Sequence, residues 1–212
     1  MTTNQLFLAS KSPRRLQLLT WAGFDVTVIA SHNHTLLAFA GDEEQHEGEL
    51  PDAYVRRTAL TKFREGLALR ASLYPNETAR PVVAADTVVS LDEEVLGKPI
   101  DEAEAKRFLR QLSSRVHLVR TAVVVGVSET DYQLVVQTSE VGFRALSEQE
   151  IATYTASPEP YDKAGGYSIQ GNGGLFVNHL SGSYSGVMGL PIAETVDLLS
   201  RYQTVAASVE RA

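Results

Sequence analysis

The sequence predicts an α/β fold in which helices flank a mixed, twisted sheet. Short apolar runs of strand length alternate along the 212 residues with longer stretches whose apolar residues recur at helical spacing. Some of the predicted strands are joined by only a few residues, which suits antiparallel hairpins and not parallel crossovers. The apolar fraction of 43% and the charged fraction of 21% are ordinary for a globular protein, so we expect residues 1–212 to form a single domain.

The first part of the chain should form two strands and two helices. The patterns predict, in order, a strand, a helix, a second strand, a long loop and a second helix, at residues 5–9, 10–23, 24–30, 31–50 and 51–73. Gly23 is a usual residue for the end of a helix. A loop as long as the predicted one is usually functional or mobile.

The second part should begin with a strand buried on both faces, because residues 82–85 are all apolar. Asp101 is suited to cap the next helix, and Ser147 and Glu150 have the spacing of a capping box. The remaining patterns predict a helix, two long strands, a helix, a segment rich in Gly, Ser and Asn, and a last helix, at residues 101–112, 116–128, 132–143, 147–155, 158–189 and 191–202.

Charge and composition exclude several function classes. The net charge is −7 and the acidic residues are spread out, which argues against binding of nucleic acid or of an anionic membrane. No apolar run approaches the roughly 20 residues that span a bilayer, and no secretory signal is visible, so we expect a cytoplasmic protein. Because the chain has no cysteine, any metal must be held by oxygen or imidazole, and oxygen ligands favour magnesium or manganese.

One short segment combines a carboxylate at the end of a buried strand with a cation. Asp86 follows the apolar run, and Lys98 follows an acidic turn. Burying such a carboxylate is unfavourable unless a metal, a cation or a hydrogen-bond donor meets it. The segment suits metal-assisted chemistry on a phosphate-bearing substrate, or else a structural Asp–Lys pair at a sheet edge. Lys62 either joins this cluster or lies on the surface, and Thr87 should face the opposite side of the strand unless the strand bends.

The start of the first helix has the features of an anion site. Ser12 suits the cap position, and Pro13 suits the first helical position. Free amides and the positive end of the helix dipole attract anions there. Arg14 and Arg15 oppose that dipole, so they cost stability unless a negative group binds. The alternative is a capped helix with two solvated arginines.

A glycine-rich segment over residues 162–174 allows the backbone to approach a ligand closely. It is neither a Walker loop nor a dinucleotide-binding fingerprint. Gln170 has an amide that can read a base edge by a paired donor and acceptor, although a structural glutamine fits equally well. His32 and His34 form an H-x-H pair in the long loop, where histidines are more often solvated than bound to metal.

Three segments, found in the same order, resemble the Maf family of nucleoside triphosphate pyrophosphatases, which is related in fold to the ITPase-like enzymes. They are residues 8–15 (LASKSPRR), residues 85–89 (ADTVV) with 97–99 (GKP), and residues 163–171 (KAGGYSIQG) followed by 182–185 (GSYS) and 189–191 (GLP). Together they span nearly the whole chain. The resemblance implies an α/β fold with two lobes around a cleft.

The resemblance also implies roles for individual residues. Arg14, Thr87 and Gln170 match the set of the dTTP/UTP branch and would help to choose the base, whereas the branch acting on 7-methyl-GTP has Trp, Gln and Glu there. Asp86 would be the general base and a ligand of magnesium or manganese. Four residues would hold the phosphates, namely Ser12, Arg15, Lys62 and Lys98.

The chain departs from the family pattern at the second metal-binding carboxylate. Counting forward from the first helix puts His34 at that place, whereas counting back from the second helix puts it within residues 42–44. We favour an insertion of about nine residues, with Glu43 or Glu44 as the carboxylate, because the loop is overlong. The metal ligands expected from the resemblance are therefore Asp86 and Glu43.

The expected function is a nucleotide house-cleaning reaction, the metal-assisted hydrolysis of dTTP, UTP or modified pyrimidine nucleotides to the monophosphate and pyrophosphate. Asp86 would take the proton of the attacking water, while Arg15 and Lys98 neutralise the leaving group. The alternative is a nucleotide-binding regulator of cell division with weak or no catalysis. A sugar-nucleotide transferase would need an acceptor pocket that the sequence does not indicate. A homodimer is left open.

Overall fold

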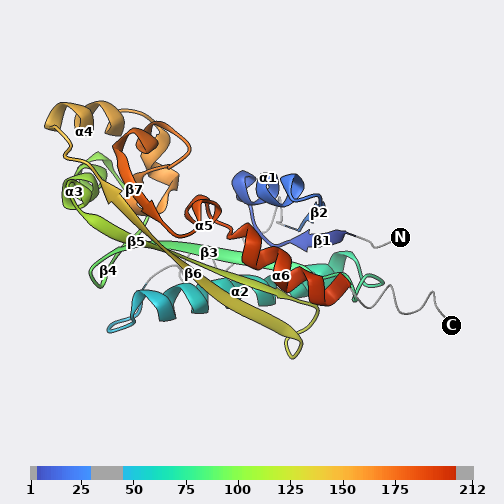
Figure 1. Cartoon of the computed structure of the whole chain (residues 1–212). Helices are drawn as coiled ribbons and strands as arrows, with labels where there is room; N and C mark the ends of the chain where they lie inside the picture. Colours follow the sequence, from blue (N-terminus) through green and yellow to red (C-terminus); the bar gives the residue numbers. More distant parts are fainter. Residues whose placement is uncertain (1–3, 30–44, 204–212) are drawn as a thin grey trace.

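The computed structural model describes residues 4–29 and 45–203, and these form one mixed sheet with helices on both faces (Figure 1). The seven strands of this part of the chain are β1 (Gln5–Leu8), β2 (Asp25–Val28), β3 (Val82–Leu91), β4 (Glu94–Leu96), β5 (Val116–Gly126), β6 (Tyr132–Phe143) and β7 (Val177–Ser181). Their order in the sheet is β2-β1-β3-β5-β6-β7, and β4 pairs with β3. Strand β1 is parallel to β2 and β3, whereas the other pairs are antiparallel, so the expected mixed sheet is confirmed.

Helices cover both faces of the sheet. The described residues form α1 (Pro13–Trp21), α2 (Pro51–Leu73), α3 (Glu102–Leu112), α4 (Glu148–Thr155), α5 (Tyr184–Met188) and α6 (Ile192–Gln203), with short 3₁₀ helices η2 (Glu159–Asp162), η3 (Ala164–Gly166) and η4 (Asn172–Phe176). Helix α2 lies on one face, and α1, α5 and α6 lie on the other (Figure 1). Each face has its own apolar core, with Phe63 in one and Leu19 in the other.

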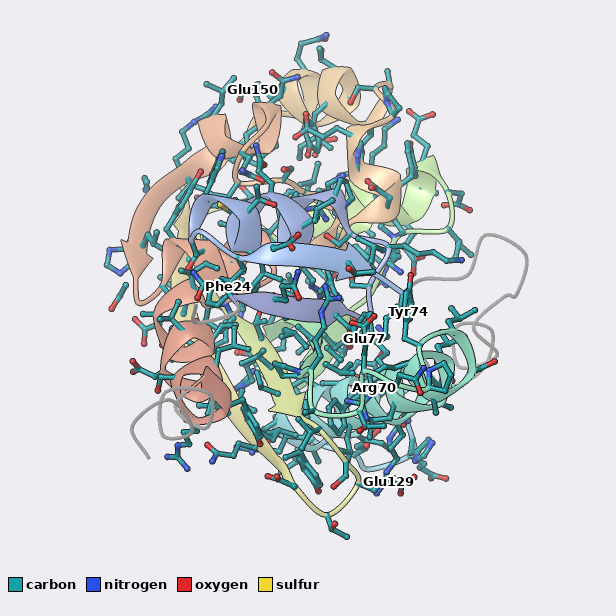
Figure 2. The ribbon with its side chains drawn as sticks, turned by 90° about the vertical axis from the view of Figure 1, so that its right-hand side faces the viewer. Phe24, Arg70, Tyr74, Glu77, Glu129 and Glu150 are labelled. Carbon is teal, nitrogen blue, oxygen red and sulfur yellow. The ribbon has the colours of Figure 1, made fainter. Side chains whose placement is uncertain are left out.

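A second lobe is formed by α3, α4 and β7 together with the beginning of β5 and the end of β6 (Figure 1). Its core is rich in aromatic rings, among them Phe108, Phe143 and Phe176. Figure 2 shows Glu150, in α4, and Glu129, at the turn between β5 and β6, at opposite ends of the molecule. The long strands therefore connect the two lobes.

Local signals at several helix ends are confirmed. Gly23 adopts a φ of 88° just after α1, and the Phe24 N–H donates to the Leu19 carbonyl across the helix end, which is a Schellman motif. Asp101 caps α3 by accepting from the Glu104 N–H, and Ser147 with Glu150 forms the predicted capping box of α4. Every described helix is too short or too polar to span a bilayer.

One local prediction is wrong, and another is confirmed in position but lacks the side-chain hydrogen bond. The strand predicted at 82–85 does not end at Asp86 but continues to Leu91, because residues beyond it pair with β5 on one side and with β4 on the other. Asp86 is therefore in the middle of a strand. Ser12 occupies the cap position of α1, but its side chain makes no capping hydrogen bond, and its backbone N–H donates to the Ser10 hydroxyl instead.

Candidate active site

The site lies where β3 has an open edge. On one side, β1 pairs with β3 only as far as Val83, and β4 begins to pair with it only at Val89. No strand of the described chain covers this edge between them, while the other edge is paired with β5 throughout. Side chains on both faces of β3 can thus reach one cavity of about 300 Å³. This volume is at the lower end of the range for ligand pockets.

Asp86 faces α2 and is held there by two side chains. Its two carboxylate oxygens accept from Lys62 Nζ and from Thr58 Oγ1, each over 2.6 Å. The Lys62 and Asp86 side chains are only 7% and 13% exposed. Burial alone would raise the pKa of Asp86, but the charges of Lys62 and Arg15 and these hydrogen bonds lower it below its usual value. Asp86 is therefore ionised at neutral pH.

Arg15 lies on the opposite side of the same opening. Its guanidinium donates to the Gly189 carbonyl over 2.8 Å, to the Ser10 hydroxyl over 3.1 Å and to the Thr87 hydroxyl over 3.4 Å. Gly189 has a φ of 118°, and a Cβ there would lie 3.6 Å from both Arg15 Nε and Thr87 Oγ1. Glycine keeps the space beside both groups open, and Arg15 is fixed at the cavity wall.

Thr87 follows Asp86 on the other face of β3, as the strand period predicted. Its hydroxyl is 2.9 Å from that of Thr121, its direct partner on β5. Thr121 in turn donates to the carbonyl of Gly186, in α5, over 2.7 Å. The hydroxyls of two strands and the backbone of a helix thus form one chain of hydrogen bonds beneath the cavity.

The glycine-rich loop that carries Gln170 is held by a carboxylate that the sequence analysis missed. Glu159 accepts from the backbone N–H groups of Asn172 and Gly173 and from the Tyr154 hydroxyl, each over 3.0 Å. A side chain at Gly171 would collide with this carboxylate. An acidic residue shortly before a loop with free backbone amides is the signal that could have identified it.

Tyr167, on the same loop, is buried. Its hydroxyl is 2.8 Å from Nε2 of His117, which is buried on β5. Both rings pack edge to face with Phe143. Burial lowers the pKa of His117 to about 4 and raises that of Tyr167, so both groups are neutral at physiological pH. This pair connects the loop to β5.

The cavity brings together eight residues that the sequence singled out, namely Ser12, Arg14, Arg15, Lys62, Asp86, Thr87, Lys98 and Gln170. The loop residues that the sequence proposed as metal ligands, Glu43, Glu44, His32 and His34, lie outside the described residues. Lys62 joins the Asp86 cluster, which answers the question that the sequence left open.

Among the described residues that line the cavity, Asp86 is the one buried carboxylate that could bind a divalent metal. The described residues contain no group of three or more acidic or histidine side chains close enough to hold an ion. Of the two acidic residues that line the cavity, Asp162 is 70% exposed and paired with Lys163, whereas Asp86 is enclosed. Each Asp86 oxygen accepts one hydrogen bond, from Lys62 or from Thr58, and has a second lone pair that a metal could use. Magnesium is commonly held by one or two carboxylates together with substrate phosphates, so Asp86 fits this role.

A protein-family model and relatives of similar sequence match almost the whole chain. The family model described as Maf-like protein matches residues 5–202. The chain is 44% identical to "dTTP/UTP pyrophosphatase" of Dechloromonas aromatica, covering 93% of this chain and 96% of the relative, and 46% identical to the protein of the same name in Pseudoalteromonas translucida, covering 94% and 98%. A crystal structure titled as a nucleoside-triphosphatase, dITP/XTP pyrophosphatase, of Mycobacterium abscessus is similar over 97% of each chain, with 19% identity and a TM-score of 0.42.

Proposed function

The chain belongs to the Maf family, and on that premise we propose that it hydrolyses dTTP and UTP to the nucleoside monophosphate and pyrophosphate. One observation supports this above the others: a single cavity combines an ionised, buried carboxylate with several cations and with an amide that can read a base. The residues that make it come from both faces of β3, from two helices and from the glycine-rich loop. A regulator without catalysis would need the phosphate cations but not Asp86.

The cations of the cavity suit a triphosphate. Arg15, Lys62 and Lys98 line it together with the first residues of α1, whose free amides favour anions. The leaving pyrophosphate gains negative charge as the bond to the α-phosphorus breaks, and fixed cations in an enclosed site stabilise that charge. We assign these three side chains and Ser12 to the phosphates.

Asp86 is placed to act as the general base. A water oxygen attacks the α-phosphorus, the bond from that phosphorus to the bridging oxygen of the β-phosphate breaks, and the water proton passes to the carboxylate. In the free protein, the charges of Lys62 and Arg15 help to lower the pKa of Asp86 and so weaken it as a base. Bound phosphates would compensate those charges and raise the basicity of Asp86 when substrate is present.

A divalent ion, magnesium or manganese, would be held by Asp86 and by substrate oxygens. When bound, it supplies neutralisation of phosphate charge and makes a bound water more acidic. The second protein ligand expected from the sequence, Glu43 or Glu44, stays a prediction. The cytoplasmic location and the homodimer also stay predictions.

Base selection is assigned to Arg14, Thr87 and Gln170. All three line the cavity, and Arg14 and Gln170 come from different elements, the first turn of α1 and the glycine-rich loop. The amide of Gln170 offers one donor and one acceptor, which matches the paired groups on a pyrimidine edge. Thr87 lies directly beside Arg15, which is assigned to the phosphates, so the base and the phosphates would share this part of the cavity wall.

The test is a panel of nucleoside triphosphates assayed for pyrophosphate release with magnesium and with manganese. Turnover of UTP and dTTP well above that of purine nucleotides is the expected result. Asp86→Asn should lower kcat by about 10²- to 10⁴-fold while nucleotide binding stays measurable. The matched control is Asp92→Asn, since Asp92 is 79% exposed and paired with Arg115 away from the cavity. Full activity of Asp86→Asn would remove the proposed base.

A further inference from the structure

The hydroxyl of Ser10 already accepts two hydrogen bonds. Ser10 follows β1, is only 5% exposed and lines the cavity. Its Oγ accepts from the backbone N–H of Ser12 over 3.2 Å and from Arg15 Nη1 over 3.1 Å. A backbone N–H and a guanidinium can only donate, so these two bonds occupy both lone pairs of the hydroxyl.

The remaining hydrogen-bonding capacity of Ser10 is its own proton. Within residues 4–29 and 45–203, its side chain makes the two hydrogen bonds just named, and neither uses this proton. A buried donor without an acceptor is unfavourable, so an acceptor from outside the chain, either water or a ligand, should meet it. Because Ser10 is otherwise enclosed, such a group reaches it through the cavity.

The two accepted bonds together limit what that ligand can be. The bond to Ser12 alone would make Ser10 a turn residue, and the bond to Arg15 alone would make it a support for the guanidinium. With both bonds in place the hydroxyl can no longer accept, so a ligand group that donates finds no partner there. An anionic phosphate oxygen only accepts, and it fits both the proton of Ser10 and the charge of the adjacent Arg15.

The position of Ser10 relative to Asp86 assigns it to one part of the substrate. In phosphoryl transfer the attacking and leaving oxygens lie roughly in line, on opposite sides of the phosphorus. Asp86, the proposed base, faces α2 from one face of β3, whereas Arg15 is bonded to Thr87 on the other face. With the water attacking from the side of Asp86, the leaving pyrophosphate lies on the side of Arg15 and Ser10.

We propose that Ser10 is a further substrate-binding residue, which donates its hydroxyl proton to an oxygen of the leaving pyrophosphate. The inference rests on the proposed function and adds a donor to the side chains already assigned to the phosphates. A hydrogen bond to a charged oxygen is roughly twice as strong as one between neutral groups. It strengthens further as negative charge builds on the leaving group.

The experiment measures the binding of magnesium pyrophosphate and of UMP by calorimetry, which needs no turnover. Ser10→Ala removes a hydrogen bond to a charged group, so it should weaken pyrophosphate binding by about tenfold or more and leave UMP binding nearly unchanged. Ser90→Ala is the matched control, since Ser90 is also buried and accepts from Arg120 Nη1 over 2.6 Å but does not line the cavity. Wild-type affinity for pyrophosphate in Ser10→Ala, or an equal loss for pyrophosphate and UMP, would overturn the proposal.

A crystal structure of the wild type with magnesium pyrophosphate separates a direct contact from an effect through Arg15, and it covers the case that Ser10→Ala does not fold. The Ser10 Oγ should lie about 2.7 Å from a pyrophosphate oxygen. A separation of more than about 3.5 Å from every such oxygen would refute the contact, even if Ser10→Ala binds pyrophosphate weakly. If the nucleotide panel shows no turnover, the proposed function fails, while these two measurements still decide whether Ser10 binds pyrophosphate.

Discussion

Replacing Lys62 by methionine should show how strongly the fold depends on the pair that Lys62 forms with Asp86. The two charged groups are 2.6 Å apart, and their side chains are only 7% and 13% exposed, so water screens them little. Removing one partner of a buried pair leaves the other charge uncompensated and costs about 3–5 kcal/mol. Because Thr58 still donates to the carboxylate and Arg15 keeps its charge nearby, we expect Lys62→Met to lose about 3 kcal/mol of unfolding free energy near neutral pH.

The loss should depend on pH in a defined direction. In the wild type, burial would raise the pKa of Asp86, but Lys62 and Arg15 lower it below the ordinary value of 3.8. The stability that Asp86 contributes is therefore present above pH 3.8 and lost as the pH falls further. Without Lys62 the effect of burial is less opposed, and the carboxyl takes up a proton at higher pH. Protonation removes the uncompensated charge, so the difference between variant and wild type should shrink from about pH 8 to about pH 4.5.

Urea unfolding followed by circular dichroism at both pH values measures this difference. The single tryptophan, Trp21, is 68% exposed and is a poor fluorescence reporter of unfolding. Lys106→Met is the matched control, since Lys106 pairs with Glu102 at the surface, where such a pair is worth at most about 1 kcal/mol. The double variant Lys62→Met, Asp86→Asn should recover part of the loss. A Lys62→Met variant no less stable than the control, or equally destabilised at both pH values, would refute the argument.

Two further predictions concern the glycine-rich loop and His117, the β5 residue that contacts it. In Glu159→Gln, an amide NH₂ faces a backbone N–H from which the carboxylate now accepts a hydrogen bond, so the loop that carries Gln170 should loosen. KM for UTP should then rise about tenfold, with kcat little changed. The control variant Glu148→Gln, at the surface, should behave as the wild type, and an unchanged KM in Glu159→Gln would contradict the role of Glu159. Because burial lowers the pKa of His117 from 6.5 to about 4, the unfolded chain binds a proton first on acidification, and the wild type should lose roughly 3 kcal/mol of stability between these two values. Unfolding titrations across this range should show a weaker pH dependence for His117→Gln, and equal slopes would rule out this source.

Much of the local structure could be predicted because its causes are local. Apolar residues at helical spacing gave the bounds of α2 as residues 51–73, which the structure confirms. The caps at Asp101 and Ser147 depend on side chains that reach only three residues along the chain. The strand after residue 81 was predicted too short because a polar pair, Asp86 and Thr87, interrupts its apolar pattern, and only pairing with distant strands continues it.

The site was harder to predict where its contacts are between residues far apart in the sequence. Lys62 and Asp86 are 24 residues apart, and only the packing of α2 on the sheet decides that they touch. Thr121 lies within an apolar strand and reads as a core residue. Its place beneath the cavity comes from the register that sets it opposite Thr87, 34 residues away, and from the approach of α5. No pattern within one element contains that information.

The open edge of β3 also has a consequence for solubility. An exposed strand edge can pair with a strand of another chain, which leads to aggregation, and proteins usually protect such edges. Here the open stretch lies between β1 and β4 and not at the border of the sheet, so both of its ends are occupied by strands of the same chain. A small molecule can enter a gap of this kind, but a strand from another molecule needs a longer free edge. The arrangement therefore gives a ligand access to the middle of a sheet without offering a template for aggregation.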